Sequence, residues 1–223
     1  SRKLNTQKAA VLYDRRVSAG LIGAFLGAIS GPSVARGVSF LKDRMGEQVF
    51  ADGIHIIDDP FRPMGMGSRS HDGEGLPVQE THLIDNGRLT SWLLNSSSAR
   101  QLGMEPNGFS ALGFGDPPGV TTSNLYLKAG DKTPGELVKG AGKGLLVTDM
   151  FGPSINPNNG DYSVGVSGFW FEAGEIAYPV SEVTIAGDLP SMFARLIPAS
   201  DLEFRGTRDA PSILIEDMSL AGS

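Results

Sequence analysis

The sequence of 223 residues contains no cysteine. Disulfides and thiolate metal ligands are therefore excluded, and redox chemistry does not fix the compartment of the protein. Histidine is also scarce, with three residues, and no helical His-Glu-x-x-His zinc motif is present. The longest uncharged apolar run, residues 17–34, is interrupted by glycine, serine and proline. A membrane-spanning helix needs about 20 predominantly apolar residues, so we expect a soluble, cytoplasmic protein that does not contact a membrane.

Positive charge is not in excess, since the formal net charge is −6 at pH 7. Nucleic acids and anionic membranes favour a clustered basic face, and an acidic chain offers no such electrostatic attraction. We therefore expect no direct contact with nucleic acid.

Glycine and proline are abundant, with 30 and 14 residues spread along the chain. This distribution is typical of a turn-rich β protein. Strand patterns include residues 8–13 and a hairpin, 81–84 with 88–94, across the turn Asp85-Asn86-Gly87. No linker interrupts the chain. The sequence predicts one α+β domain over residues 1–223, a mostly antiparallel sheet of barrel or sandwich type packed around a buried glycine-rich helix, with a few short helices.

The predicted glycine-rich helix covers residues 17–30. Gly20, Gly23 and Gly27 fall on one face, and apolar residues such as Leu21 and Phe25 fall on the other. Each glycine costs about 1 kcal/mol relative to alanine in a helix. We therefore expect a neighbouring backbone to approach the glycine face closely.

A second hairpin is predicted within residues 158–187, which hold the densest aromatic run of the chain. Its turn is Glu172-Ala173-Gly174-Glu175, where Gly174 can take the positive φ that such a turn favours. This stretch contains no histidine. We interpret it as a sheet platform rather than as the place of the chemistry.

The three histidines differ in their surroundings. His55 and His82 lie in predicted strands, where a structural role is favoured. His71 stands beside Asp72 and Glu74 in a loop bordered by glycine. These three residues could fix a turn, contact a substrate or hold a divalent cation, and the sequence leaves the alternatives open.

Several segments together closely resemble the TldD/PmbA family, in its PmbA (TldE) branch. They include Asp72-Gly73-Glu74-Gly75 and Tyr178-Pro179-Val180-Ser181-Glu182. The full set comprises residues 16–23, 35–43, 72–75, 98–103, 122–127, 160–163, 168–170, 174–187 and 200–204. The resemblance covers nearly the whole chain and corresponds to the family's C-terminal domain, so the N-terminal α/β domain of the family is expected to be absent.

The resemblance implies a subunit of a metallopeptidase heterodimer that processes or degrades unfolded peptides. In the TldD branch, a helical His-Glu-x-x-x-His motif and a later cysteine hold the metal. Ser18, Ala19 and Gly23 occupy the matching positions here. The resemblance therefore implies no catalytic residue and no metal in this chain, no activity of the chain alone, and a metal, expected to be zinc, in a TldD-like partner.

Positions shared with the catalytic branch are Asp72, Glu74 and Asn124, with Arg36 as a further candidate. They are expected to contact peptide or the partner subunit, or else to fix turns. Exposed strand edges could also receive an extended peptide by β-addition. Two alternatives remain, a self-sufficient metallopeptidase with a relocated site near His71, Asp72 and Glu74, and a protein-binding modulator of DNA gyrase. Self-association of the isolated chain is left open.

Overall fold

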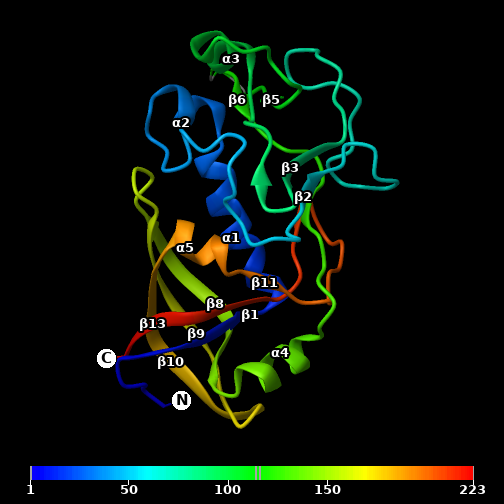
Figure 1. Ribbon diagram of the computed structural model, residues 1–223. Helices are drawn as coiled ribbons and strands as arrows, with labels where there is room; N and C mark the ends of the chain where they lie inside the picture. Colours follow the sequence, from blue (N-terminus) through cyan, green and yellow to red (C-terminus); the bar gives the residue numbers. More distant parts are fainter. Residues whose placement is uncertain (1, 114, 116, 223) are drawn as a thin grey trace. The chain divides into compact units, whose positions relative to one another are not determined.

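The computed structural model describes residues 2–113, 115 and 117–222. These residues form two compact units, each with its own strands and helices (Figure 1). The first unit contains residues 1–22, 128–203 and 210–223, and the second contains residues 23–127 and 204–209. The single domain inferred from the sequence stays a prediction, and each unit is described by itself.

Five long strands of the first unit form a closed barrel. They are β1 (Gln7–Tyr13), β8 (Gly144–Ile155), β9 (Asp161–Glu172), β10 (Glu175–Asp188) and β13 (Ile213–Gly222). The hydrogen-bonded order is β1-β8-β9-β10-β13, and β13 pairs again with β1, while the short β11 (Ile197–Pro198) adds to β13. Only the β1–β8 pair is parallel among these pairings. The expected α+β fold with a mostly antiparallel, barrel-like sheet is confirmed.

The burial of β9 and β1 explains why these segments form a barrel. Along β9 every second residue from Tyr162 to Trp170 is buried, as expected for a strand with one covered face. In contrast, β1 buries five successive residues, 9–13, because both of its faces are covered.

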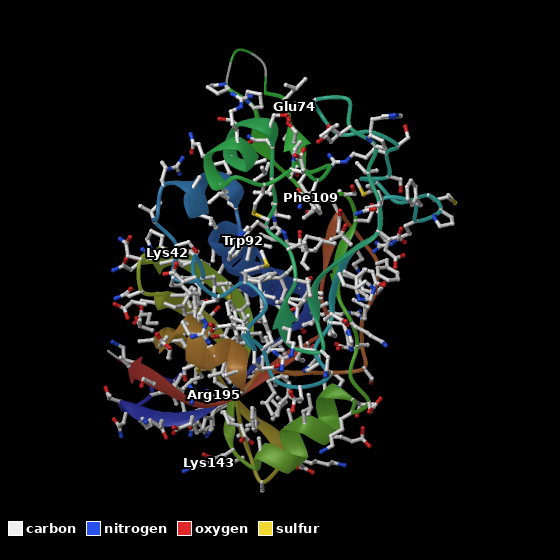
Figure 2. All side chains as sticks on the ribbon, turned by 45° about the horizontal axis from the view of Figure 1, so that its top comes forward. Lys42, Glu74, Trp92, Phe109, Lys143 and Arg195 are labelled. Carbon is white, nitrogen blue, oxygen red and sulfur yellow. The ribbon has the colours of Figure 1, made fainter. Side chains whose placement is uncertain are left out.

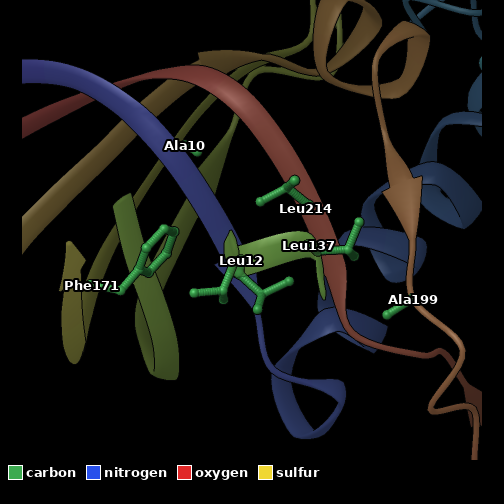
Figure 3. Close-up of a cluster of buried hydrophobic side chains, with 7 residues drawn as sticks. Ala10, Leu12, Leu137, Phe171, Ala199 and Leu214 are labelled. Carbon is green, nitrogen blue, oxygen red and sulfur yellow. The ribbon is translucent and has the colours of Figure 1, made fainter. Parts of the chain in front are cut away.

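The outer face of β1 packs against helix α4 (Pro134–Ala141). Figure 3 shows Ala10 and Leu12 of β1 gathered with apolar side chains from other strands and from α4. The buried cluster consists of Ala10, Leu12, Leu137, Val138, Phe171, Ala199 and Leu214. At the start of α4, Thr133 Oγ1 accepts from Glu136 N, and Thr133 N donates to Glu136 Oε2. This capping box follows from the local sequence Thr133-Pro134-Gly135-Glu136.

The second hairpin also forms as predicted, and a short helix follows it. Asp161–Glu172 and Glu175–Asp188 pair across the turn, where Gly174 has a φ of +78°. Helix α5 (Leu189–Ala194) follows β10 and begins at Asp188, whose side chain accepts from Ser191 N. Its residues Leu189, Met192 and Phe193 are buried, and the Met192 side chain lies against Gly187 of β10.

The second unit is built on a smaller sheet. Its strands are β2 (Ile56–Asp58), β3 (Thr81–Asp85), β4 (Arg88–Leu89), β7 (Leu125–Leu127) and β12 (Arg208–Asp209), in the order β12-β7-β2-β3-β4. The predicted Asn-Gly hairpin is confirmed, because Asn86 and Gly87 both have positive φ, at 47° and 78°. The second strand of the hairpin is shorter than predicted and ends at Leu89.

Short helices and a two-stranded pair complete this unit. They are α2 (Gly31–Ala35), α3 (Ser96–Leu102), β5 (Ser110–Ala111) and β6 (Gly119–Val120). Gly31 admits a close backbone approach, since a methyl group there would lie 2.6 Å from the Leu93 carbonyl oxygen. Among the described residues, no helix combines the length and the apolar character that a bilayer crossing requires.

Helix α1 (Arg15–Ala28) begins in the first unit and ends in the second. Its apolar face is buried as predicted, with Leu21, Ile22 and Phe25 at most 1% exposed. The expected reason for its glycines was wrong. A methyl group on Gly27 would meet no atom within 4 Å, and one on Gly20 would meet only the end of the Met150 side chain. No neighbouring backbone therefore requires glycine at these two positions.

Candidate functional site

The positions on α1 that resemble the family's metal motif offer one oxygen atom. Ser18 is fully buried, and its hydroxyl donates to the Arg15 carbonyl at 3.4 Å. Ala19 and Gly23 have no side-chain donor atom. A metal of the metallopeptidase type needs several nitrogen, oxygen or sulfur ligands that converge on it. These residues do not fit a metal, and we derive no catalytic step through one at α1.

Asp72 is buried and its carboxylate holds a loop together. Oδ1 accepts hydrogen bonds from Glu74 N at 2.9 Å and Leu76 N at 3.0 Å. Oδ2 accepts from Ser110 N, at the start of β5, at 3.0 Å. All three donors are backbone groups, so the geometry favours the turn-fixing alternative for this residue.

Glu74 reaches out of the same loop to the start of α3 (Figure 2). Its Oε2 accepts from Ser96 N and from Ser96 Oγ, both at 2.9 Å. A carboxylate is favourable there because the first turn of a helix has unpaired N–H groups and a positive dipole end. His71 points elsewhere, with Nδ1 3.0 Å from Ser70 Oγ. The three residues of the relocated-site alternative therefore have separate partners.

Asn124 is fully buried and directly precedes β7. Its Oδ1 accepts from Gly67 N at 2.8 Å, and its Nδ2 donates to the Asp59 carbonyl at 2.8 Å and to Ser68 Oγ at 2.9 Å. The amide thus uses both donors and its acceptor within the protein. This arrangement favours a loop-fixing role over contact with a ligand.

Arg36 is exposed at the end of α2 and lines a pocket of about 310 Å³. The other lining groups are amide, hydroxyl and proline side chains, so Arg36 is the charged member. The lining residues are Pro32, Arg36, Asn95, Ser97, Ser98, Gln101, Pro117 and Pro118. A guanidinium beside amides and hydroxyls can bind a carboxylate or the carbonyl groups of a peptide.

The pocket is organised by the start of α3. Asn95 caps this helix by accepting from Ser98 N at 2.9 Å, and its Nδ2 donates to the Pro118 carbonyl at 2.7 Å. Two of the predicted site residues therefore lie near the start of α3. Arg36 lines the pocket there, and Glu74 accepts a hydrogen bond from Ser96 N. Asp72 supports Glu74 from the loop, whereas Asn124 belongs to a different set of contacts. Local patterns indicate no site role for Asn95 or Gln101, although Gln101 lies in a segment that resembles the family, because the pocket forms only when α2, α3 and residues 117–118 meet.

The described residues also include one group of metal-ligating type that the sequence did not single out. His55, His82 and Asp85 each bring one ligand atom within 4.8 Å of the others. His71 is not part of this group. Both histidines of the group had been assigned structural roles, because the strand pattern alone did not place them on one face.

These features define an α+β chain with a closed barrel, a polar pocket beside α3, and no ligand set on its glycine-rich helix. The chain belongs to the TldD/PmbA family, since residues 6–222 match the family model described as PmbA/TldA metallopeptidase C-terminal domain.

Three comparisons illustrate the relationship. The chain is 38% identical to "Metalloprotease PmbA" of Escherichia coli O157:H7 over 99% of this chain and 47% of that protein. It is 32% identical to a solved Thermotoga maritima protein described as a candidate modulator of a DNA gyrase, with a TM-score of 0.89 over 99% of this chain and 51% of that one. TldE of Thermococcus kodakarensis shares the fold, with a TM-score of 0.87 at 23% identity over 98% of this chain and 51% of that one. The chain therefore spans about half the length of the curated relatives it matches.

Proposed function

We propose that this chain is the C-terminal part of a non-catalytic, PmbA/TldE-like subunit in a cytoplasmic metallopeptidase heterodimer that acts on unfolded peptides. The observation that carries the proposal is the composition of α1. Where the family's catalytic branch has metal ligands, this helix has Ser18, Ala19 and Gly23, and the one hydroxyl among them is buried and bonded to the backbone. The cleavage step then belongs to a TldD-like partner that carries the metal.

The pocket beside α3 is the proposed peptide contact of this subunit. Its Arg36 supplies charge for a peptide carboxylate or carbonyl, and the exposed Gln101 supplies an amide group for main-chain atoms, while Asn95 holds the wall of the pocket in place. Such contacts are independent of the peptide's side chains, which suits a subunit that handles unfolded substrates. Asp72 and Glu74 act on this pocket indirectly, by holding the loop that meets α3.

Peptide capture by β-addition at the barrel is not retained in the proposal. The paired parts of β8 and β9 have hydrogen-bonded neighbours on both sides, and β13 returns to β1. A closed sheet offers no free edge along these parts for an added strand. The pocket is therefore the better candidate for substrate contact.

The proposal is tested by peptidase assays with an unfolded reporter peptide. We expect no cleavage by the chain alone, and cleavage when a TldD-like subunit is co-expressed with the full PmbA-like protein that contains this chain. Cleavage by the chain alone would overturn the proposal, as would full activity of the TldD-like subunit in the absence of any PmbA-like protein.

A matched pair of variants tests the pocket. Arg36→Ala should raise KM for the peptide about tenfold, because a hydrogen bond to a charged group contributes about 1.5 kcal/mol or more. Arg100→Ala is the control, since Arg100 is exposed on α3 and does not line the pocket. Equal KM values for the two variants would remove the pocket from the proposed function and leave the subunit role standing.

A further inference from the structure

His55, His82 and Asp85 form a compact group at one end of the hairpin in the second unit. His55 Nδ1 lies 2.9 Å from Asp85 Oδ1, and His82 Nδ1 lies 3.6 Å from the same oxygen. The two imidazole rings stand nearly perpendicular, with centroids 6.2 Å apart. Two imidazoles and a carboxylate, which come from β3 and from the segment before β2, form a ligand set favoured by first-row transition metals.

A β-bulge in β3 brings the three side chains to one face. Residue 56 pairs with residue 84 and residue 57 with residue 82, so Leu83 is an extra residue between the two pairs. Its insertion buries Leu83 and Ile84 in succession and leaves His82 and Asp85 both exposed. In a regular strand, positions three apart would point to opposite faces. The bulge is therefore what makes the group, and strand periodicity could not predict it.

The turn after Asp85 is held in place by the segment that carries His55. Gly53 N donates to Asn86 Oδ1 at 2.7 Å, and Gly87 N donates to the Ile54 carbonyl at 2.8 Å. A methyl group on Gly87 would meet the Ala51 carbonyl oxygen at 2.5 Å, so the approach of the two segments depends on glycine. Asp85 and His55 are thus brought together by the fold itself, before any ion is bound.

We propose that His55, His82 and Asp85 bind a divalent first-row transition ion such as Zn²⁺, with water completing the coordination. Bonds of about 2.0 to 2.2 Å in a tetrahedral site place neighbouring ligand atoms about 3.3 to 3.6 Å apart. The 3.6 Å separation at His82 lies at the upper end of this range, and the 2.9 Å separation at His55 lies below it, so ion binding requires His55 Nδ1 and Asp85 Oδ1 to move slightly apart. On the other side of the His82 ring, Glu80 Oε1 lies 3.7 Å from Nε2. In metal sites, a carboxylate at this position orients the histidine that binds the metal.

This inference goes beyond the proposed function and is independent of it. It departs from the expectation that the chain holds no metal, and it leaves α1 without one. The site joins the segment before β2 to the end of β3, so the ion stabilises the folded second unit. We assign it no part in peptide cleavage.

A proton is the competing occupant. A ring nitrogen and a carboxylate oxygen 2.9 Å apart need either a shared proton or a metal ion between them. Metal binding requires neutral imidazoles and releases protons, so the two occupants exclude each other at His55. The experiment therefore measures the ion directly.

Zinc titration of the chain against a chromogenic chelator tests the proposal. We expect one Zn²⁺ per chain, and an affinity at least about tenfold lower in His82→Ala and in Asp85→Asn, since even outer groups of metal sites contribute that much. His71→Ala is the matched control, because His71 is the exposed histidine outside the group. Zinc should also raise the Tm of the chain and of His71→Ala, and leave the Tm of His82→Ala unchanged.

The proposal is overturned if no stoichiometric ion binds, or if His71→Ala loses as much affinity as His82→Ala. Retention of full affinity by both His82→Ala and Asp85→Asn also overturns it. Circular dichroism without zinc verifies that the variants fold. Both are expected to fold, because the side chains of His82 and Asp85 are 44% and 57% exposed. Peptide cleavage with the TldD-like partner should be unaffected in His82→Ala, so failure here is distinct from failure of the proposed function.

Discussion

At the scale of single residues, Asp72 and Glu74 show how two neighbouring carboxylates take different tasks. The buried Asp72 accepts three backbone hydrogen bonds, whereas the exposed Glu74 accepts two hydrogen bonds from Ser96. The burial of Asp72 matters most, because backbone donors that lose their acceptor away from water remain unsatisfied.

The substitution Asp72→Ala should therefore lower the free energy of unfolding by about 3 kcal/mol, and Glu74→Ala by about 1 kcal/mol or less. Urea unfolding of the two variants provides the measurement, and each serves as the control for the other. If Asp72→Ala kept normal stability and lost peptide affinity instead, Asp72 would belong to the binding surface and the turn-fixing role would be wrong.

Asp58 is a buried carboxylate with an unusual protonation equilibrium. It is 2% exposed, and its burial raises its pKa to about 6, although the hydrogen bond from Ser123 N at 2.7 Å acts in the opposite direction. Because the folded-state pKa lies above the ordinary value of 3.8, the folded protein binds this proton more tightly than the unfolded chain does. The resulting stability is present below about pH 4 and is lost as pH rises to about 6.

The variant Asp58→Asn removes this titration and keeps an oxygen that can accept from Ser123. We expect the wild-type chain to lose stability relative to Asp58→Asn between about pH 4 and pH 6, by an amount on the order of 3 kcal/mol. Thermal unfolding of both proteins across this pH range gives the comparison. Parallel pH profiles for the two chains would contradict the shifted pKa.

Residue identities alone predicted which positions were shared with the family, but not what those positions touch. Asn124 and Asp72 were candidates for peptide contact, and in the structure both side chains form hydrogen bonds with backbone groups of other residues of the chain. The contacts come from loops far apart in the sequence, such as residue 72 with residue 110, so local patterns carried no information about them.

At the scale of elements, local chemistry was predictive. The Asn86-Gly87 turn and the turn at Gly174 formed as predicted, because each depends on neighbouring residues. The capping box of α4 has the same local origin. The bulge at Leu83 was missed for the opposite reason. It depends on the register between β2 and β3, which the pattern of a single strand does not contain.

Two glycines provide a clear test of packing at this scale, because the same residue type occupies an open position in α1 and a crowded one in β9. Gly27 lies near the end of α1 with no atom close to its missing side chain, whereas a methyl group on Gly168 of β9 would collide with the Leu146 carbonyl. Gly27→Ala should raise the free energy of unfolding by about 0.5 to 1 kcal/mol, through helix propensity and a less flexible unfolded chain. Gly168→Ala should lower it by about 3 kcal/mol through overpacking.

Urea unfolding of the two glycine variants measures both effects under the same conditions. Opposite signs are the expected result. Destabilisation by Gly27→Ala would restore the earlier expectation that the glycine face of α1 is needed for a close approach.

At the scale of the whole chain, family resemblance predicted more than physical patterning did. Alternation and turn residues indicated an antiparallel α+β protein, and this was confirmed. Closure of the barrel was only one of two predicted alternatives, since it depends on pairing between β1 and β13 at opposite ends of the sequence. The hairpin at residues 161–188 identifies the family and forms part of the barrel wall, and the proposed chemistry lies elsewhere.

The pairing of β1 with β13, which closes the barrel, has a consequence for synthesis on the ribosome. Gln7 pairs with Leu220, so β1, once it has been synthesised, waits for about 200 further residues before its antiparallel neighbour exists. At about 5 to 20 residues per second, the interval is about 10 to 40 s. During that time the apolar residues 9–13 lack their pairing with β13. Residues 23–127, which make up most of the second unit, are complete much earlier. The nascent barrel is therefore the part of this protein for which protection by a chaperone would matter most.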